Sequence, residues 1–402
     1  MLPRTLEHES HTAGRIKLKL LMVWFLVIDE KLHAFPLLRD LAAMCRKGHE
    51  VTCIVPIVRR VPESVEPGLK IDAVRLHYSI PVFSYLLFCT RALRLLHRHV
   101  RLADVVIAGA DEVPLIVPWL LQRKMRGKST PRFAVRVLSP IVESRSTHRY
   151  YQHVLRYVSM MLARYADVVF AISPMHANDI SSAYGIRHDR IQVWPSTVDL
   201  SLFDPSMYRA DRRDVRSELG FEDMFTLMYH GVLTAERGLD ELVQAVKMAN
   251  DEGYRVGLLL LGKGSSEQQL RSLIASLDLS DNVRLHASVP YDQVPRFIAA
   301  CDAGAIPLPD QEQWRYQAPT KLLEYLAMQK AVIATEIPAH RWLMRGYEQA
   351  FYCGKGHQSE IKAAIVRCIN ARSVRQHPDQ HAADQFSSET VADKVVVALS
   401  SK

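Results

Sequence analysis

The stretch "APTKLLEYLAMQKAVIA" (318–334) has the pattern of an amphipathic helix that leads directly into an apolar strand. Pro319 suits the start of a helix, because its fixed backbone angle matches the first turn. The short run "AVIA" is typical of a buried strand. Glu324 does not fit this packing, since a carboxylate buried among leucines costs several kcal/mol unless another group pairs with it. The sequence therefore predicts a helix–strand unit in which Glu324 either reaches solvent or has a partner.

The same alternation of apolar strands and helical stretches runs through most of the chain, which is the signature of parallel α/β sheets. In the second half we expect strands near 225–231, 256–264, 282–288, 303–309 and 331–338, with helices near 238–252, 266–278, 291–300 and 319–329. In the first half we expect strands near 20–28, 50–56, 103–110, 133–139 and 166–173, and a helix near 35–47. The predicted fold class is α/β, with two doubly wound domains that face a central cleft. Ligands of such folds bind beyond the carboxyl ends of the strands.

The length of 402 residues also favours two domains, because one ordinary core serves about 150–200 residues. Residues 194–221 lack a sheet pattern and mix Pro, Asp and Ser, so we interpret them as an interdomain linker. We place the domains at 1–203 and 204–385. The last stretch, 386–402, has the pattern of a helix with Ser387 or Ser388 as its N-cap. We expect this helix to return towards the first domain.

The composition is that of an ordinary globular protein, with 48% hydrophobic and 23% charged residues. A net charge of +8, from 51 basic and 43 acidic residues, favours an anionic partner such as a nucleotide or a phospholipid. An ordinary solvated basic surface is the alternative. We expect no nucleic acid, because no aromatic and basic interleaving resembles a known binding module.

The six cysteines are scattered and form no C-x-x-C pair, which argues for a reducing compartment and against a zinc site or a disulfide framework. The first residues are polar and unlike a signal peptide. The apolar run 20–28 is about half the length that spans a bilayer. We therefore expect a cytoplasmic protein.

Three predicted strand-to-helix junctions carry residues that suit a bound phosphate. In the first, Gly231 follows a strand, where a missing Cβ lets a ligand approach the backbone, and Arg237 precedes a helix. In the second, Gly262 and Lys263 follow a strand without the spacing of a Walker A loop. For these two, an ordinary turn with a solvated cation is the alternative.

The third junction is the start of the helix at Pro319. An anion placed there gains amide donors and the helix dipole, and Thr320 and Lys321 can add side-chain contacts. Lys321 and Glu324 are three residues apart and share a helix face. If phosphates bind at the helix start, Glu324 lies one turn deeper, where an attached ribose would present two hydroxyls to its carboxylate.

The order and spacing of these stretches resemble glycosyltransferase family 4, group 1, which has the GT-B fold of two Rossmann-like domains. The resemblance covers residues 160–402 well and the first 160 loosely. It is carried by "YHGVLTAERGLDELVQA", by "LLGKGSSEQQL" and the residues that follow to 307, by "APTKLLEYLAMQKAVIAT", and by residues 166–205, with "STVD" where many members have Asn-Gly-Val-Asp.

The resemblance implies a retaining transfer from a UDP-, GDP- or ADP-sugar to an acceptor, with no cofactor and no metal. The first domain would bind the acceptor and the second the donor. Arg237 matches the basic residue on the donor diphosphate, Gly231 the close-approach glycine and Glu324 the ribose-binding carboxylate, and Lys321 joins Arg237 and Glu324 in the catalytic set. The backbone of Ala287, Ser288 and Val289 matches the loop that contacts the base. The donor site would also include Val232, Gly262, Lys263, Tyr316, Pro319 and Thr320.

The chain departs from the family pattern at several positions. Tyr316 stands where the first Glu of E-x7-E is expected, so Glu312 or Asp310 would have to replace it. Val232 replaces an arginine that often follows the glycine, and the loop after the first strand lacks Gly-Gly. The acceptor-side catalytic residue is not identifiable; the candidates are His33, His148 and Glu143. A non-catalytic GT-B protein that binds a nucleotide or a partner is therefore the alternative.

The expected acceptor is a glycan or a lipid-linked molecule. Residues 80–101 combine aromatics and leucines with four arginines, and residues 121–136 add a second basic cluster. Apolar surface with cations around it suits an anionic membrane surface or a polyprenyl phosphate. This favours peripheral contact with the inner face of a membrane, and a core helix with a solvated basic edge is the alternative.

Overall fold

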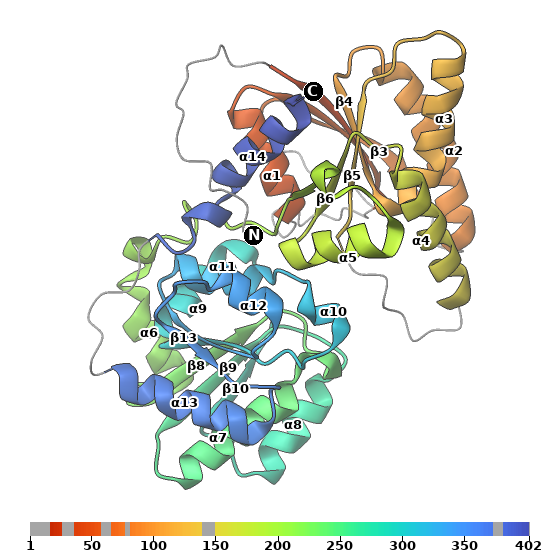
Figure 1. Ribbon diagram of the computed structural model, residues 1–402. Coiled ribbons are helices and arrows are strands. Elements are labelled where there is room, and N and C mark those ends of the chain that lie inside the picture. The colour runs from red at the N-terminus through yellow and green to blue at the C-terminus, as the bar shows by residue number, and fades with distance from the viewer. Residues whose placement is uncertain are drawn as a thin grey trace.

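The computed structural model describes residues 17–25, 36–57, 66–76, 81–138, 149–372 and 381–401. Within these residues the strands form two sheets, each entirely parallel and covered by helices on both faces (Figure 1). The predicted fold class of two doubly wound α/β domains is confirmed. The short apolar runs became strands because burial on both faces of a parallel sheet selects continuous apolar segments.

The first sheet has the strand order β3-β2-β1-β4-β5-β6-β7. Its central strand β4 is buried along its whole length, and the pairing of β1 with both β2 and β4 makes the order reverse beside β1. The strands are β1 (Lys19–Val23), β2 (Glu50–Ile57), β3 (Leu69–Arg75), β4 (Val105–Gly109), β5 (Arg132–Arg136), β6 (Val168–Ala171) and β7 (Ile191–Val193). The helices are α1 (Pro36–Arg46), α2 (Pro81–His99), α3 (Val113–Met125), α4 (Arg149–Ala163) and α5 (Pro174–Tyr184).

The two outermost strands, β3 and β7, were not predicted from the sequence. β3 has the sequence LKIDAVR, and most of its residues are partly exposed. β7 is three residues long and has one exposed residue. Edge strands bury little surface, so their sequences do not show the apolar run by which the central strands were recognised.

The second sheet has the order β10-β9-β8-β11-β12-β13. The strands are β8 (Phe225–His230), β9 (Val256–Leu261), β10 (Val283–His286), β11 (Ala303–Ile306), β12 (Ala331–Ala334) and β13 (Ala350–Tyr352). The helices are α6 (Asp211–Leu219), α7 (Leu239–Asp251), α8 (Glu267–Ser276), α9 (Val294–Ala300), α10 (Glu312–Arg315), α11 (Thr320–Ala327), α12 (Pro338–Leu343) and α13 (Gln358–Arg372). In this half the predicted strands and helices lie where the sequence placed them, within a few residues.

The interpretation of the whole span 194–221 as a linker was wrong for its C-terminal part. Residues 211–219 form α6, which packs on α9 and places Val215 and Leu219 in the core of the second domain. The two buried residues are four apart, which is the spacing of one helix face. The surrounding Arg and Asp residues hid this short signal.

The C-terminal helix α14 (Ser388–Ser400) lies beside α1 of the first domain (Figure 1). Ser387 is its N-cap, because its hydroxyl accepts from the amide of Thr390. Arg46 and Lys47 reach Glu389 and Asp393 of α14 at 2.6 Å each. The chain thus crosses back to the first domain after completing the second.

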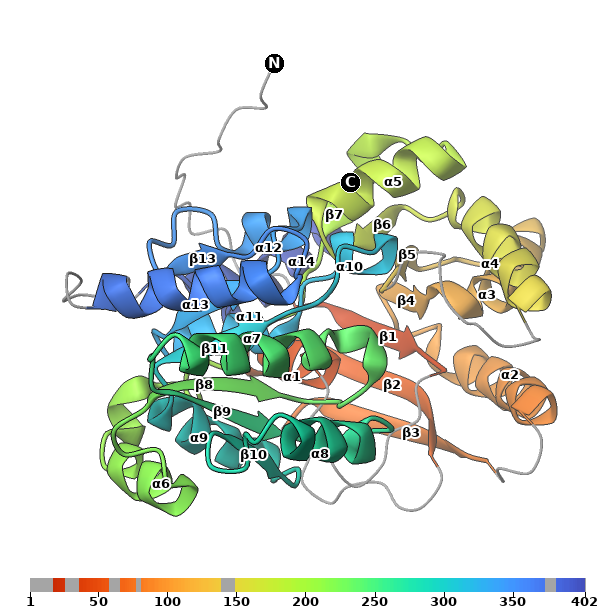
Figure 2. The ribbon, with the colours of Figure 1, turned by 90° about the horizontal axis from the view of Figure 1, so that it is seen from below.

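The two sheets contact each other through segments that follow the carboxyl ends of their strands. His176, at the start of α5 after β6, stacks on Tyr316 with ring centres 6.0 Å apart. Arg39 of α1, after β1, contacts Tyr291, which follows β10. Figure 1 shows α1 and α11 at the facing ends of the two domains, and Figure 2 shows both sheets from below. This is the edge at which doubly wound folds bind ligands.

Two further features of the described residues bear on the expected partners. None of the described helices is long and apolar enough to cross a membrane. Those residues also contain no group of three His, Cys, Asp or Glu side chains that could hold a metal ion.

Candidate functional site

The loops after β8 and β9 approach each other so closely that only glycine fits. A Cβ on Gly262 would lie 1.8 Å from the carbonyl oxygen of Gly231, and one on Gly264 would lie 1.9 Å from that of Leu233. Gly231 itself is exposed and has a φ of 119°, which glycine adopts without strain. Gly262 therefore serves loop packing, and Gly231 leaves open backbone at the strand end. Lys263, which lies between Gly262 and Gly264, is exposed.

Arg237 and Lys321 come together beside this open backbone. The Arg237 guanidinium lies 4.4 Å above the ring of Trp314, and Lys321 Nζ lies 3.6 Å from the ring centre of Tyr229. Lys321 Nζ is also the atom that a Cβ on Gly231 would approach to 3.0 Å. Burial and the neighbouring Arg237 lower the pKa of Lys321 well below its ordinary value, against the opposing effect of Glu324. Two basic side chains held this close repel each other when both are protonated, and an anion between them favours their protonated forms.

The helix start that carries Lys321 adds amide donors to these cations. α11 begins at Thr320, and its N-cap Pro319 makes no side-chain capping bond. The amides of a first helical turn lack partners within the helix, and together with the dipole they attract a negative group. Thr320 and Pro319 are partly exposed. The structure thus brings together Gly231, Arg237, Pro319, Thr320 and Lys321 as the sequence predicted.

Glu324 is 2% exposed, and its partners answer why a carboxylate stands among leucines. Its Oε2 lies 2.6 Å from His230 Nε2, and its Oε1 accepts a 2.6 Å hydrogen bond from the Tyr291 hydroxyl. Although burial acts in the opposite direction, the hydrogen bonds from His230 and Tyr291 lower the pKa of Glu324 below its ordinary value. The carboxylate is therefore held as an anion inside the protein.

His230 is the residue of this site that the sequence did not reveal. Tyr325 donates its hydroxyl hydrogen to the carbonyl of Met228 at 2.8 Å, so His230 Nδ1, 3.0 Å from the same hydroxyl, must be the donor to it. Because the ionised Glu324 can only accept, the proton of its hydrogen bond with His230 lies on Nε2. The signal that was available is position: His230 ends β8 directly before Gly231.

The expected base-binding loop follows β10. Ala287 and Ser288 are exposed, and Val289 is partly buried against the core of the second domain. The loop lies beside Gly262, whose amide donates to the carbonyl of His286 at 2.9 Å. Ala287, Ser288 and Val289 thus lie next to the loop after β9, at the same edge of the sheet.

The region of the missing first Glu is occupied by an aromatic contact. Tyr316 is partly buried and stacks on His176 of the first domain. Asp310 is held by Arg315 at 2.6 and 3.0 Å, whereas Glu312 is exposed. Val232 is 54% exposed beside Gly231. The acceptor-side candidates His33, His148 and Glu143 lie outside the described residues.

The first domain presents a buried acid at the corresponding edge, which the sequence analysis did not single out. Glu112 follows β4, is 1% exposed and accepts the amide hydrogen of Phe25 at 2.7 Å. Its Oε2 has no hydrogen-bond partner. Burial, with a smaller effect of Asp111, raises the pKa of Glu112 to about 8. A neutral carboxylic acid therefore lies at the end of β4 at neutral pH.

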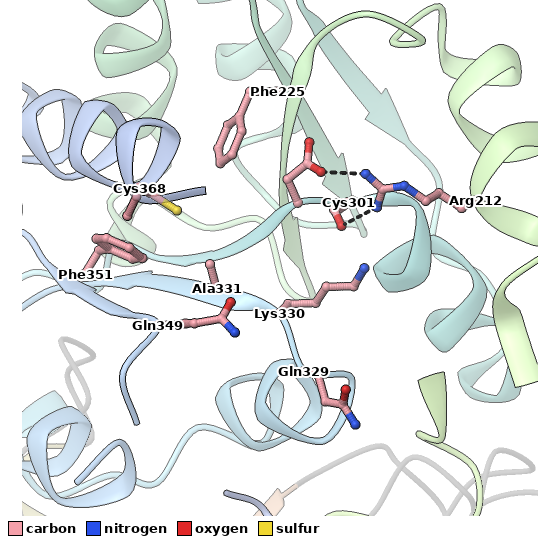
Figure 3. A pocket seen from close by; sticks show the side chains of 11 residues that line it. Arg212, Phe225, Cys301, Gln329, Lys330, Ala331, Gln349, Phe351 and Cys368 are labelled. Atoms are coloured by element: carbon pink, nitrogen blue, oxygen red, sulfur yellow. Dashed lines mark hydrogen bonds and ion pairs between the residues drawn. The ribbon is translucent and has the colours of Figure 1, made fainter. Parts of the chain in front are cut away.

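A separate cavity of about 260 Å³ lies at the opposite, amino-terminal edge of the second sheet, near the starts of β8 and β12 (Figure 3). Lys330 donates to the carbonyl of Ala299 at 2.9 Å, and Arg212 pairs with Asp302 at 2.6 Å. Burial and the nearby Arg212 lower the pKa of Lys330 to about 8. Lys330 and Arg212 thus bind the C-terminal end of α9, and Arg212 also pairs with one carboxylate. We therefore interpret the residues that line the cavity as stabilising the contact of α6 with α9.

Two known families match the chain. The model described as "Glycosyl transferases group 1" matches residues 211–385, and that described as "Glycosyltransferase Family 4" matches residues 37–202. The first match covers the second sheet and its helices, and the second match covers the first sheet from β2 to β7 without β1.

Individual known proteins are similar over part of the chain. A D-inositol 3-phosphate glycosyltransferase of Pseudarthrobacter chlorophenolicus is 29% identical over 143 residues, which are 35% of this chain and 33% of that protein. The mannosylfructose-phosphate synthase of Agrobacterium fabrum is 27% identical over 151 residues, 36% of this chain and 33% of that protein. The similarity thus spans about a third of the length of these curated relatives.

Solved structures are similar over nearly the whole chain. HepE of Anabaena, solved in complex with UDP and glucose, has a TM-score of 0.71 and 16% identity, with 96% of this chain and 100% of that chain covered. The catalytic domain of starch synthase IV of Arabidopsis thaliana, bound to ADP and acarbose, has a TM-score of 0.73 and 13% identity, with 95% and 99% covered. At these identities the likeness shows the fold alone.

Proposed function

The chain belongs to glycosyltransferase family 4 and has the GT-B fold, and from this premise we propose that it transfers a sugar from a nucleotide-sugar to an acceptor with retention at the anomeric carbon. The observation that carries the proposal is the pair Arg237 and Lys321. Their cations lie beside the open backbone of Gly231 and the start of α11. Neither forms a salt bridge with a carboxylate of the described residues. A donor diphosphate would supply the negative charge that pairs with these two side chains.

In the proposed reaction the bond between the anomeric carbon and the phosphate oxygen breaks while the acceptor oxygen forms a bond to the same carbon, on the face that the phosphate leaves. The acceptor hydroxyl gives its proton to the departing phosphate oxygen, so atoms and charge balance without a side-chain base. The diphosphate gains charge in this step. Arg237, Lys321 and the amides of α11 are already in place to stabilise it, and such preorganised groups contribute several kcal/mol. We propose that they do so without a metal ion.

The rest of the donor would lie along the same edge of the second sheet. The ribose hydroxyls would donate to Glu324, and the base would contact the backbone of Ala287, Ser288 and Val289. HepE was solved with UDP and UDP-glucose, and starch synthase IV with ADP, so relatives of this fold bind different bases. The sequence and the contacts described here leave UDP-, GDP- and ADP-sugars as donors to be tested.

We place the acceptor on the first domain and propose a glycan or lipid-linked acceptor at the inner face of a membrane. The support is the flank formed by α2 and α3, away from the second domain (Figure 1). Its cations, among them Arg91, Arg94 and Arg98, are exposed. Leu102 is 67% exposed and Met125 81%, which is unusual for large apolar residues. Cations with exposed apolar side chains suit an anionic lipid surface.

A panel of UDP-, GDP- and ADP-sugars tests the donor proposal. A ligand at 100 times its Kd adds about 2.7 kcal/mol to the folded state, so the true donor should raise the unfolding temperature. The stabilising donor is then incubated with candidate acceptors, and the anomeric configuration of the product is determined by NMR. We expect the configuration of the donor to be retained and the rate to survive EDTA. A product of inverted configuration, or activity lost to EDTA and restored by Mg²⁺, would contradict the proposal.

A further inference from the structure

A chain of contacts connects the first domain to the proposed ribose-binding carboxylate of the second. Arg39, on α1, donates from one terminal nitrogen to the Tyr291 hydroxyl and from the other to the carbonyl of Thr197 at 2.9 Å. Its guanidinium carbon lies 5.0 Å from the centre of the Tyr291 ring. Tyr291 then reaches Glu324 Oε1 at 2.6 Å. Four residues from four separate segments of the chain thus form one connected path.

The direction of these hydrogen bonds follows from the groups involved. A guanidinium can only donate, so the Tyr291 oxygen is the acceptor from Arg39. The single hydrogen of that hydroxyl is then free to point at Glu324, which is held as an anion and accepts it. With Arg39 in place, the Tyr291 hydroxyl hydrogen has one orientation. Glu324 Oε1 therefore accepts this hydrogen bond from one fixed direction.

The same path is attached to the segment that joins the two sheets. Thr197 lies between β7 and α6, and its hydroxyl donates to the buried Asp40 of α1 at 2.5 Å. The Tyr291 ring packs on Phe203 of the same segment, with ring centres 5.5 Å apart. A change in the angle between the domains would therefore have to alter the contacts of Arg39 with Tyr291 or Thr197.

We propose that Arg39 and Tyr291 are positioning residues of the donor site, through which the first domain orients the ribose-binding carboxylate of the second. Each oxygen of a carboxylate has two lone pairs, so Oε1 keeps one for a ribose hydroxyl after accepting from Tyr291, and Oε2 keeps one beside His230. Without the Tyr291 hydroxyl the carboxylate is fixed by His230 alone. The inference rests on the proposed function, because it assigns the ribose to Glu324.

The test measures ribose recognition rather than binding alone. Binding of UDP, GDP and ADP, and of their 2′,3′-dideoxy forms, is measured by calorimetry for the wild type, Tyr291→Phe and Arg39→Met. Tyr291→Phe keeps the ring against Phe203 and removes only the hydroxyl. For the nucleotide that binds, we expect the wild type to prefer the ribose form at least about tenfold, as for hydrogen bonds to a charged group. Both variants should lose at least fivefold of that preference and bind the dideoxy form within about twofold of the wild type.

Arg46→Met is the matched control. Arg46 is on the same helix as Arg39 and also bridges distant segments, through Glu66 and Glu389, but it has no contact with Tyr291. The ribose preference of the Arg46→Met variant should equal that of the wild type. Equal losses for ribose and dideoxy forms in Tyr291→Phe and Arg39→Met would show a structural role only and overturn the inference.

Two other results separate this inference from the proposed function. A wild type that prefers the ribose form, with variants that keep the preference or bind nucleotide more tightly, overturns the inference alone. A wild type that binds none of the six nucleotides contradicts the proposed function, and the inference fails with it.

Discussion

At the scale of single residues, Arg237 is the side chain on which the proposed donor site most depends. Its guanidinium lies over the ring of Trp314, 4.4 Å from the ring centre, and forms no salt bridge with a carboxylate of the described residues, so it is oriented without being neutralised. Stacking of this kind suits arginine and not lysine, because the guanidinium is planar. A residue that served only folding would gain more from a partner of opposite charge.

Arg237→Ala is expected to lower kcat/KM for sugar transfer at least about a hundredfold, equivalent to roughly 3 kcal/mol of lost stabilisation of the departing diphosphate. Arg237→Lys should retain part of the rate, since the charge remains and the stacking is lost. Arg345→Ala, which changes an exposed arginine far from these loops, is the control. Steady-state kinetics with the donor found in the panel would measure all three. A rate for Arg237→Ala within fivefold of the wild type would remove this residue from the site.

Glu112 makes the stability of the protein depend on pH. Its pKa is raised by burial from 4.5 to about 8, so between these values the folded protein binds a proton that the unfolded chain has lost. The contribution of Glu112 to stability therefore falls as the pH rises from 4.5 to 8. Glu112→Gln has the shape of the protonated acid and cannot ionise.

We expect Glu112→Gln to be at least about 1 kcal/mol more stable than the wild type at pH 8, with a smaller difference at pH 5. Urea unfolding at the two pH values measures it, and the comparison with the wild type removes the effect of groups that both proteins share. A difference that is the same at pH 5 and pH 8 would show that Glu112 is already ionised in the folded protein.

At the scale of elements, α2 has features of both interpretations that its sequence allowed, which are membrane contact and a core helix with a solvated basic edge. Phe88, Ala92 and Leu96 are buried in the core of the first domain, while Arg91, Arg94 and Arg98 are exposed. Packing explains the apolar face fully. It does not explain the exposure of these cations or of the large apolar residues Leu102 and Met125, and this is the part that a membrane would explain.

The triple change of Arg91, Arg94 and Arg98 to Glu is expected to abolish binding to vesicles with anionic lipid, because each basic residue near such a surface contributes about 1 kcal/mol. Wild-type binding should weaken steeply with salt. The control changes Arg255, Arg271 and Arg345 of the second domain to Glu and gives the same net charge. Vesicle co-sedimentation distinguishes the two variants. Equal binding of the wild type to neutral and anionic vesicles would leave α2 as a core helix with a solvated edge.

At the scale of the whole molecule, the two domains are tied by contacts that are distant in sequence. α14 completes the core of the first domain, where Val391, Ala392, Val395 and Leu399 are buried with residues of α1 and β1. The domain that begins the chain is therefore finished by its last helix. Its salt bridges to Arg46 and Lys47 are exposed and contribute little.

Leu399→Ala should lower the free energy of unfolding by about 2 kcal/mol, the lower end of the range for a buried leucine. Val397→Ala, on the same helix and 65% exposed, should change it by less than about 0.5 kcal/mol. Urea unfolding at equilibrium measures both. If the two variants were equally stable, α14 would not be part of the first domain's core in solution.

Much of the architecture followed from local sequence alone. Central strands such as 256–261 are recognisable because burial on both faces requires continuous apolar residues. The family motifs placed Gly231 at the end of a strand and Glu324 one turn inside a helix. The family and the GT-B fold expected from these stretches are confirmed by the matches. The assignment of individual donor-site residues remains a prediction.

The partners of Glu324 were decided only by tertiary structure. His230 is 94 residues away in sequence and Tyr291 is 33 away, so no local pattern could pair them with this carboxylate. The contact of Arg39 with Tyr291 spans 252 residues and depends on how the two domains meet. Periodicity reports which side of a segment is buried, because burial repeats with the helix or strand. It does not report which polar group from a distant segment arrives there, and in this protein that choice determines whether a carboxylate among leucines is stable.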